Sequence, residues 1–272
     1  MAKHAFGFDV CHLFPRPTVA SVMSLRAAGA VAIAVWIATA TVSFAQSEVP
    51  KPVLVELFTS EGCSSCPPAD ALLIELDQRQ PIPGVEVIAL GHHVDYWNGI
   101  GWADRFSSRD ATLRQQRYTS QLRLQSPYTP ELVVDGHLDV VGNDRPEVRR
   151  LIADAARAAK PATVKLAAPS ANVIRIEVEG VPSPSDVMLA ITESDLSTSV
   201  RGGENGGREL RHTAVVRTLR RLGSTADGRF SASVPVVYRP EWNRGHLRAV
   251  VFAQQGAGPI LGVGMIALKE KP

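Results

Sequence analysis

The stretch Val53-Leu54-Val55-Glu56-Leu57-Phe58, with Gly62-Cys63-Ser64-Ser65-Cys66-Pro67 shortly after it, is the most informative part of this chain. The first six residues are nearly all apolar and predict a buried strand. A second apolar run, Val85–Leu90, follows after one segment of helical length. A strand that leads into a Cys-x-x-Cys at the start of a helix, inside a β-α-β pattern, is typical of a thiol–disulfide redox site.

The N-terminal residues 1–45 are typical of an export signal. Ala27–Ser47 is uncharged and rich in Ala, Val and Ile, a basic residue precedes it, and Ser43-Phe44-Ala45 offers small residues for cleavage after position 45. We therefore expect an exported protein, periplasmic or secreted. An uncleaved anchor is the alternative, because the apolar run approaches the length that spans a bilayer. Met23 is a conventional start for such a signal, so translation from Met1 or from Met23 is left open.

The charge balance of the chain excludes some classes of partner. The full sequence has 29 Lys and Arg and 27 Asp and Glu. The predicted signal contains three of the basic residues and one of the acidic ones, so the mature chain has no net charge. This gives no electrostatic reason to expect binding to nucleic acid or to an anionic membrane surface. Export would also place the two remaining cysteines, Cys63 and Cys66, where disulfides persist.

Residues 46–160 alternate between strand-like and helix-like stretches. The expected order is strand, helix, strand, helix, strand, strand, helix, at residues 53–58, 67–79, 85–91, 106–122, 131–135, 138–142 and 144–159. This order resembles the thioredoxin fold, and Tyr128-Thr129-Pro130 strengthens the resemblance. The resemblance implies that the Thr129–Pro130 peptide bond is cis and that this proline lies against the Cys-x-x-Cys.

Residues 161–272 have a different pattern of short β-type runs separated by turn residues. The runs are at 163–167, 173–179, 187–192, 212–219, 230–237, 247–254 and 261–268. Seven short strands in about 110 residues predict a β-sandwich. The expected fold is therefore an α/β thioredoxin-like domain over residues 46–160, followed by an all-β, sandwich-like domain over residues 161–272.

Four further stretches resemble a family of exported bacterial proteins catalogued as the domain of unknown function 1223 family. They are Phe58-Thr59-Ser60-Glu61-Gly62-Cys63-Ser64-Ser65-Cys66-Pro67, His93-Val94-Asp95-Tyr96-Trp97, Arg114-Gln115-Gln116-Arg117-Tyr118 and Arg201-Gly202-Gly203-Glu204-Asn205-Gly206-Gly207. Together they span almost the whole mature chain. The resemblance implies little about the substrate, because that family has no assigned activity.

The cysteine pair is the candidate catalytic site. Cys63 is the expected nucleophile, since the N-terminus of a helix favours a thiolate, and Cys66 is the expected resolving thiol. By the thioredoxin resemblance, Pro130 would present backbone to a bound partner. The same resemblance suggests that Glu56 is the buried acid that assists proton transfer, and a solvated residue at the sheet edge is the alternative for it.

Two other chemistries compete for these cysteines. A purely structural disulfide is one, although closing so short a loop contributes little to stability. A Zn or Cu site is the other, in which Cys63 and Cys66 are joined by His92 or His93 at the end of the neighbouring parallel strand. No second Cys-x-x-Cys supports such a site, and the chemistry of disulfide exchange needs no organic cofactor.

The loop after the second strand is the candidate binding surface. His93, Asp95, Tyr96 and Trp97 combine large amphipathic side chains with polar ones, and Thr129 is expected beside them. Self-packing of this loop over the end of the sheet is the alternative. The glycine-rich segment 201–208 is predicted to be a hairpin loop, from which Glu204, Asn205 and Arg208 are able to contact the N-terminal half of the chain.

We therefore expect an exported thiol–disulfide oxidoreductase that acts on protein thiols, protein disulfides or a small thiol. The alternative is a metal-binding or partner-binding module without redox turnover. The direction of the reaction, the reduction potential, the physiological substrate, the role of the β-rich half and the oligomeric state do not follow from the sequence.

Overall fold

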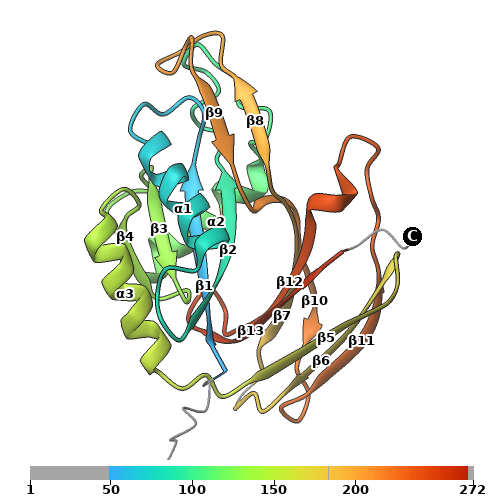
Figure 1. The fold of residues 1–272 in the computed structure, drawn as a ribbon. Coiled ribbons are helices and arrows are strands. Elements are labelled where there is room, and N and C mark those ends of the chain that lie inside the picture. The colour runs from blue at the N-terminus through green and yellow to red at the C-terminus, as the bar shows by residue number, and fades with distance from the viewer. Residues whose placement is uncertain (1–48, 183, 269–272) are drawn as a thin grey trace, which may run out of the picture. The chain divides into compact units, whose positions relative to one another are not determined.

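Both halves of the chain are rich in regular structure (Figure 1). The computed structural model describes residues 49–182 and 184–268, so the predicted signal segment lies outside the described residues. The N-terminal half contains β1 (Lys51–Thr59), α1 (Pro67–Arg79), β2 (Val85–His93), α2 (Arg109–Gln121), β3 (Glu131–Val134), β4 (Leu138–Val141) and α3 (Arg145–Arg157). The C-terminal half contains β5 (Thr163–Ser170), β6 (Val173–Glu179), β7 (Asp186–Glu193), β8 (Leu196–Ser199), β9 (Glu209–His212), β10 (Val215–Ser224), β11 (Phe230–Pro235), the 3₁₀ turn η1 (Arg244–His246), β12 (Leu247–Gln254) and β13 (Ile260–Ala267).

One mixed sheet of eight strands includes strands from both halves, in the order β13-β12-β7-β10-β2-β1-β3-β4. Strands β1 and β2 are parallel, and β3 is antiparallel to β1. The two halves join where Val215 of β10 pairs with Gly91 of β2, and the Gly91 N–H donates to Ala214 O at 2.8 Å. A three-stranded sheet, β11-β6-β5, and the separate β8–β9 hairpin complete the fold.

This arrangement corrects the expected fold class. A thioredoxin-like α/β domain followed by a separate all-β domain is wrong, because the protein is mostly β and β7, β10, β12 and β13 continue the sheet that β1–β4 begin. The order of elements predicted for residues 50–160 agrees with the structure, and the Thr129–Pro130 bond is cis. The seven predicted strands of the second half are present, but β8 and β9 were not predicted. The boundary placed between residues 160 and 161 stays a prediction.

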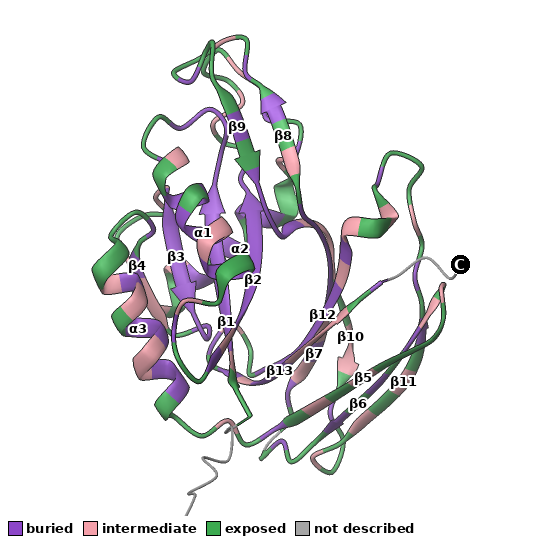
Figure 2. Cartoon of the chain, viewed as in Figure 1, coloured by how far each residue is buried: buried purple, intermediate pink, exposed green. Residues whose placement is uncertain are grey.

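Packing on the two faces of the large sheet explains why it extends through both halves. On one face, α1 and α3 cover apolar residues of β1 and β2 such as Val55 and Val87. On the other face, Leu54 and Ile88 from the N-terminal half share a cluster with Phe252 and Val263 from the C-terminal half. Burying each such side chain contributes about 1.5–3 kcal/mol. Figure 2 shows the resulting continuous burial along β1, β2 and β12.

The tight turn between β3 and β4 also contacts the C-terminal half. Asp135 and Gly136 both have positive φ, of 45° and 72°. The Asp135 carbonyl accepts a hydrogen bond from the Ile260 N–H at 2.9 Å. A Cβ atom placed on Gly136 would lie 2.5 Å from the carbonyl oxygen of Gly258, closer than any real Cβ contact. The absence of a side chain at Gly136 therefore permits the two turns to meet.

Replacing this glycine should weaken the contact between the two turns. We expect Gly136→Ala to lower the free energy of unfolding by about 2–4 kcal/mol, because the backbone oxygen of Gly258 must move. Gly84→Ala is the matched control: Gly84 has φ of 71° and no atom within 4 Å of an added Cβ, so it should lose only the about 1 kcal/mol of left-handed strain. Urea denaturation followed by circular dichroism measures both, and equal losses would contradict the contact.

Candidate functional site

The cysteine pair lies in the turn between β1 and α1 and forms a disulfide. Cys66 is the residue before the first turn of α1, and Pro67 opens the helix at the residue predicted from the sequence. Cys63 therefore precedes the helix by a turn of irregular chain. Its Sγ lies 3.3 Å from the Ser65 hydroxyl, a neutral group, and no cation contacts either sulfur among the described residues. The electrostatic support for a thiolate here comes from the helix end alone.

Both cysteines are completely buried, although Ser64 and Ser65 between them are exposed. In the disulfide form neither the expected nucleophile, Cys63, nor the expected resolving thiol, Cys66, is the more exposed. Access of any partner to the sulfur atoms therefore depends on what covers them.

The loop between β8 and β9, residues 200–208, which we call the cap loop, is bonded to the backbone around the cysteines. Asn205, fully buried, donates from Nδ2 to the carbonyl oxygens of Glu61 and Cys63, both at 2.9 Å. Glu204 accepts a hydrogen bond from the Ser64 N–H at 3.0 Å. Figure 1 shows the β8–β9 hairpin at the end of the sheet where β1 and β2 finish. The contact that the sequence allowed for Glu204 and Asn205 is thus made directly with the Cys-x-x-Cys.

The aromatic loop after β2 covers the cysteine turn from another side. A Cβ atom placed on Gly62 would lie 3.2 Å from the Cβ of Trp97, and the Trp97 indole donates to the Thr129 hydroxyl at 2.9 Å. Trp102 donates to Glu61 Oε2 at 2.8 Å. Among the predicted binding residues, Trp97 and Thr129 are therefore close to the cysteine turn.

The other residues of that predicted surface are engaged elsewhere. Asp95 accepts a hydrogen bond from the Thr112 hydroxyl at 2.6 Å, and the Tyr96 hydroxyl donates to Gln115 at 3.1 Å, so both are held against α2. Pro130 lies at the start of β3, where its carbonyl oxygen accepts from the Gly142 N–H at 2.9 Å. This carbonyl is therefore already bonded within the fold.

A buried group of acids and imidazoles lies beneath the cysteine turn. Nδ1 of His93 is 2.6 Å from Asp104, and the same carboxylate oxygen accepts from the Glu61 N–H at 2.8 Å. His212 Nε2 is 3.3 Å from the Glu61 carboxylate, and the rings of His93 and His212 are 4.7 Å apart. Asp70, on the first turn of α1, completes the set of buried residues.

The acids in this group have different affinities for protons. Burial tends to raise the pKa of Asp104, but His93 lowers it to about 2. Burial likewise tends to raise the pKa of Glu61, but the adjacent His212 imidazole and the hydrogen bond from Trp102 bring it below its ordinary value. Burial dominates at Asp70 and raises its pKa to about 6. Asp70 is therefore the acid here that gains and loses a proton near neutral pH.

Asp70, Asp104 and His212 are site residues that were not predicted from the sequence. Asp70 follows Cys66 by four residues, and residues four apart lie on the same face of a helix. That spacing was a usable signal. His212 is on β9, and its place beside Glu61 depends on a strand pairing that no local pattern reveals.

Glu56 forms a different buried network. Its carboxylate accepts from Arg114 Nη2 at 2.7 Å, lies 2.9 Å from His92 Nε2, and also accepts from the Tyr118 hydroxyl. Burial acts to raise the pKa of Glu56, but Arg114 and His92 overcome this and hold it well below its usual range. Glu56 is therefore an ionised structural anchor in this structure, and none of these contacts involves a cysteine.

The two candidate histidines of a metal site point to opposite faces of the sheet. His92 faces Glu56, whereas His93 faces Asp104, as consecutive residues of a strand must. Within residues 49–182 and 184–268, no group of three or more His, Cys, Asp and Glu is placed to hold a metal ion.

In the same part of the chain no helix has both the length and the apolar character needed to span a bilayer.

Comparison with solved structures finds a protein of similar architecture. A crystal structure of a protein from Agrobacterium tumefaciens is 25% identical, with a TM-score of 0.69, and the match covers 83% of this chain and 97% of that one. A β-glucosidase from Kluyveromyces marxianus also matches at 11% identity over 57% of this chain and 17% of its own, but its TM-score of 0.21 carries no argument.

Comparison with curated proteins finds no match. The family described as protein of unknown function (DUF1223) matches over residues 54–254, a span that contains the cysteine turn, the aromatic loop and the cap loop. The chain belongs to this DUF1223 family.

Proposed function

We propose that this protein is an exported thiol–disulfide oxidoreductase whose reacting groups are Cys63 and Cys66. The observation that carries the proposal is a disulfide at the entry to α1 that is covered by one loop and lies above titratable buried groups. A disulfide that encloses only two residues adds little to stability, so a structural role explains it poorly. Export rests on the signal pattern of residues 1–45.

The exchange proceeds in two steps that balance in electrons and protons. A thiolate of a partner dithiol attacks Cys63 Sγ, forms a mixed disulfide, and displaces Cys66 as a thiolate that takes up a proton. The second thiol of the partner then attacks its own sulfur in the mixed disulfide and releases Cys63, which is protonated in turn. Two electrons and two protons pass from the partner to the pair. The reverse steps reduce a partner disulfide, with Cys63 attacking and Cys66 resolving.

Opening of the cap loop is the access step. The sulfur atoms are buried, and the hydrogen bonds from Asn205 and to Glu204 hold the loop over them. Hydrogen bonds of this kind contribute about 0.5–1.5 kcal/mol each, so a local opening costs far less than unfolding. The loop also carries Glu204, whose carboxylate accepts a hydrogen bond from the Ser64 N–H. Opening of the cap loop would therefore move this negative charge away from Cys63.

Asp70 is the best-placed acid to exchange a proton with the leaving thiolate. It is one helical turn beyond Cys66, and its backbone N–H donates to the Cys66 carbonyl at 3.1 Å. With a pKa of about 6 it exchanges its proton near neutral pH. The sequence had suggested Glu56 for this role, but the ion pair with Arg114 keeps Glu56 charged. We therefore propose that Asp70, and not Glu56, exchanges the proton with the cysteine thiolate.

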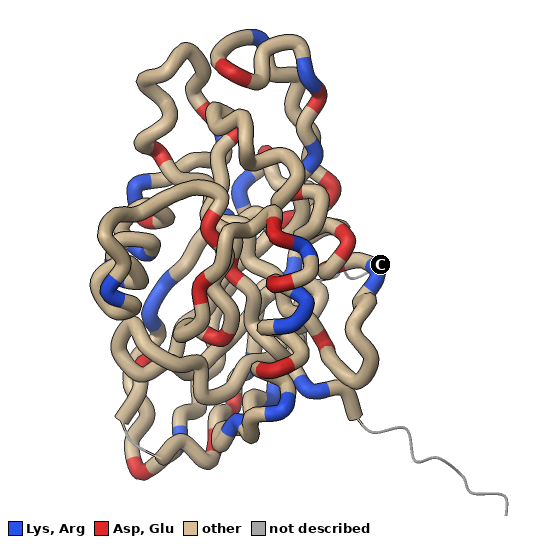
Figure 3. The backbone as a smooth tube through the Cα atoms, turned by 90° about the vertical axis from the view of Figure 1, so that its left-hand side faces the viewer, with Lys and Arg blue, Asp and Glu red and all other residues tan. Residues whose placement is uncertain are grey.

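The charge distribution fits a partner recognised through its sulfur chemistry. Figure 3 shows basic and acidic residues interspersed along the chain. This pattern supports protein thiols, protein disulfides or a small thiol as partners, since a polyanion would need a basic surface. Trp97, beside Gly62, adds apolar area next to the cysteine turn for such a partner.

Weakening the cap loop should speed reduction of the disulfide. Asn205→Ala removes both hydrogen bonds to the cysteine turn, and losing about 1.4 kcal/mol of cap stability increases the open population about tenfold. The rate of disulfide reduction by dithiothreitol should therefore rise about tenfold. The emission of Trp97 and Trp102 and the titration of free thiols measure this rate. Arg201→Gln, an exposed change in the same loop, should leave the rate unchanged. Equal rates in all three proteins would show that the cap loop does not limit access.

The raised pKa of Asp70 should make stability depend on pH in a defined direction. The folded protein keeps a proton on Asp70 up to about pH 6, whereas the unfolded chain releases it near pH 4, so stability is lost as pH rises between these values. Asp70→Asn removes this loss. Relative to the wild type, the variant should gain about 2 kcal/mol of unfolding free energy on going from pH 4 to pH 8.

Urea denaturation at several pH values measures this difference. Asp110→Asn, an acid in the first turn of α2, is the matched control and should run parallel to the wild type. If the Asp70→Asn profile also runs parallel to the wild type, Asp70 does not titrate in this window and the proton-handling role assigned to it is wrong.

The two cysteines should behave differently when one is removed. Cys66→Ser lacks the resolving thiol and should accumulate mixed disulfides with its partners in cells, whereas Cys63→Ser should accumulate few. Non-reducing gels of the exported protein, with and without reduction, detect them. Burial of both cysteines is the observation that favours the rival, a binding module without turnover. Equal trapping by both variants, or trapping by neither, would establish that rival over the oxidoreductase.

A further inference from the structure

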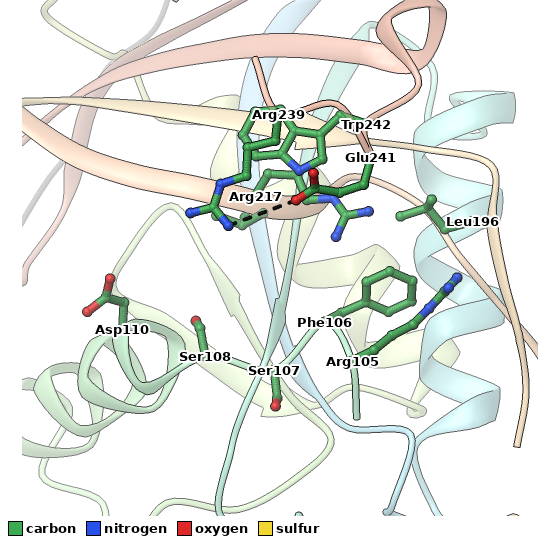
Figure 4. A pocket seen from close by; sticks show the side chains of 11 residues that line it. Arg105, Phe106, Ser107, Ser108, Asp110, Leu196, Arg217, Arg239, Glu241 and Trp242 are labelled. Carbon is green, nitrogen blue, oxygen red and sulfur yellow. Dashed lines mark ion pairs between the residues drawn. The ribbon is translucent and has the colours of Figure 1, made fainter. Parts of the chain in front are cut away.

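A cavity of about 490 Å³ lies away from the cysteine turn. Neither cysteine and no residue of the cap loop lines it. It lies between the chain that enters α2, β10 and the segment 239–242 (Figure 4). Its size is within the range of about 300–1,000 Å³ that small-molecule sites occupy. Its lining is unusual for such a site in containing three arginines, Arg105, Arg217 and Arg239.

Two of these arginines are held beside one buried aromatic ring. The guanidinium carbon of Arg105 is 4.6 Å from the centroid of Phe106, and that of Arg217 is 4.9 Å from the same centroid. Figure 4 shows the Arg105 side chain beside the Phe106 ring, and Arg217 on the wall that also carries Glu241 and Trp242. Phe106 is only 7% exposed and packs against His93 and His212, so it is a rigid support for both cations. Two like charges are therefore fixed close together before any ligand arrives.

The carboxylates nearby leave this pair of cations undercompensated. Arg217 Nε donates to Glu193 Oε2 at 2.7 Å, and the other oxygen of Glu193 accepts from the Asn243 N–H at 2.8 Å. Both oxygens of the Glu193 carboxylate therefore accept hydrogen bonds. Because Arg217 binds it through Nε, the two terminal amino groups of Arg217 can donate to other acceptors. Arg105 donates to the carbonyl oxygen of Ser197 at 2.8 Å, which carries no charge. Of the two guanidinium groups, only that of Arg217 is paired with a buried carboxylate, and the two acids of the lining, Asp110 and Glu241, are exposed.

The third arginine lies on the opposite wall with an aromatic surface. Arg239 and Glu241 are both more than 60% exposed and 4.0 Å apart, and a surface pair of this kind contributes little energy. Arg239 is therefore free to exchange Glu241 for a bound anion. Beside them Trp242 is 7% exposed and, with Leu196 and Val216, provides the apolar part of the lining.

We propose that this cavity binds a small organic molecule with an oxyanion group, a carboxylate or a phosphate, on a flat apolar body. The planar guanidinium fork of Arg105 and the terminal amino groups of Arg217 match the paired oxygens of such a group. The indole of Trp242 and its apolar neighbours accommodate the body of the ligand. This site is independent of the disulfide, so it stands whether or not Cys63 and Cys66 undergo exchange.

Titration calorimetry with three probes tests the proposal on the oxidised, exported protein. The probes are phenyl phosphate, benzoate and inorganic phosphate. We expect saturable one-to-one binding of phenyl phosphate or benzoate, at least tenfold tighter than that of inorganic phosphate, and the better of the two identifies the oxyanion. Arg105→Gln should weaken it tenfold or more, and Arg239→Gln should weaken it less. Arg175→Gln, an exposed change on β6, is the control and should bind as the wild type does.

Three results would overturn the site. They are the absence of saturable binding by both aryl anions, binding of inorganic phosphate as tightly as of phenyl phosphate, and unchanged affinity in both Arg105→Gln and Arg239→Gln. Because Arg105 also contacts Ser197 of β8, Arg239→Gln keeps the test valid if the first variant disturbs the hairpin. Repeating the titration with Cys63→Ser should give the same affinity, which separates this site from the redox proposal.

Discussion

The buried ion pair between Glu56 and Arg114 is the interaction on which much of this structure depends. Glu56 is on β1, Arg114 is on α2, and Gln254 of β12 bonds to both Arg114 and Tyr118. A buried charge left without its partner costs about 3–5 kcal/mol, so this network requires all three elements to be in place together. It thereby links the first strand of the chain to one of the last, and holds β1 in the position from which the cysteine turn leaves the sheet.

The cysteine site follows from that frame and from the cap loop. The parallel strands β1 and β2 end at the same edge, which places the cysteine turn, the aromatic loop and His93 together. The β8–β9 hairpin then covers this edge through Asn205 and Glu204. A disulfide that encloses two residues, bonded to a loop through its backbone and with the buried acid Asp70 below it, is the arrangement on which the proposed exchange rests.

The arginine cavity is built on the same support. Phe106 separates it from the buried His93 and His212 and also carries the guanidinium groups of Arg105 and Arg217. Phe106 therefore has the buried histidines beneath the cysteine turn on one side and the guanidinium groups of the cavity on the other. A protein that needs both the cysteine pair and the cavity would combine disulfide exchange with recognition of an anionic molecule.

Local sequence determined the order of elements over residues 50–160, the start of α1 at Pro67, the seven strands of the second half and the cysteine pair, because periodicity, prolines and spacing act over a few residues. Only the tertiary structure decided that the two halves share one sheet, since Gly91 and Val215 pair across more than a hundred residues. It also decided that both cysteines are buried, that Glu56 binds Arg114, and that Asp70 and His212 lie beneath the site. Apart from the helical spacing of Asp70 from Cys66, those outcomes depend on long-range pairing and burial, which no local pattern encodes.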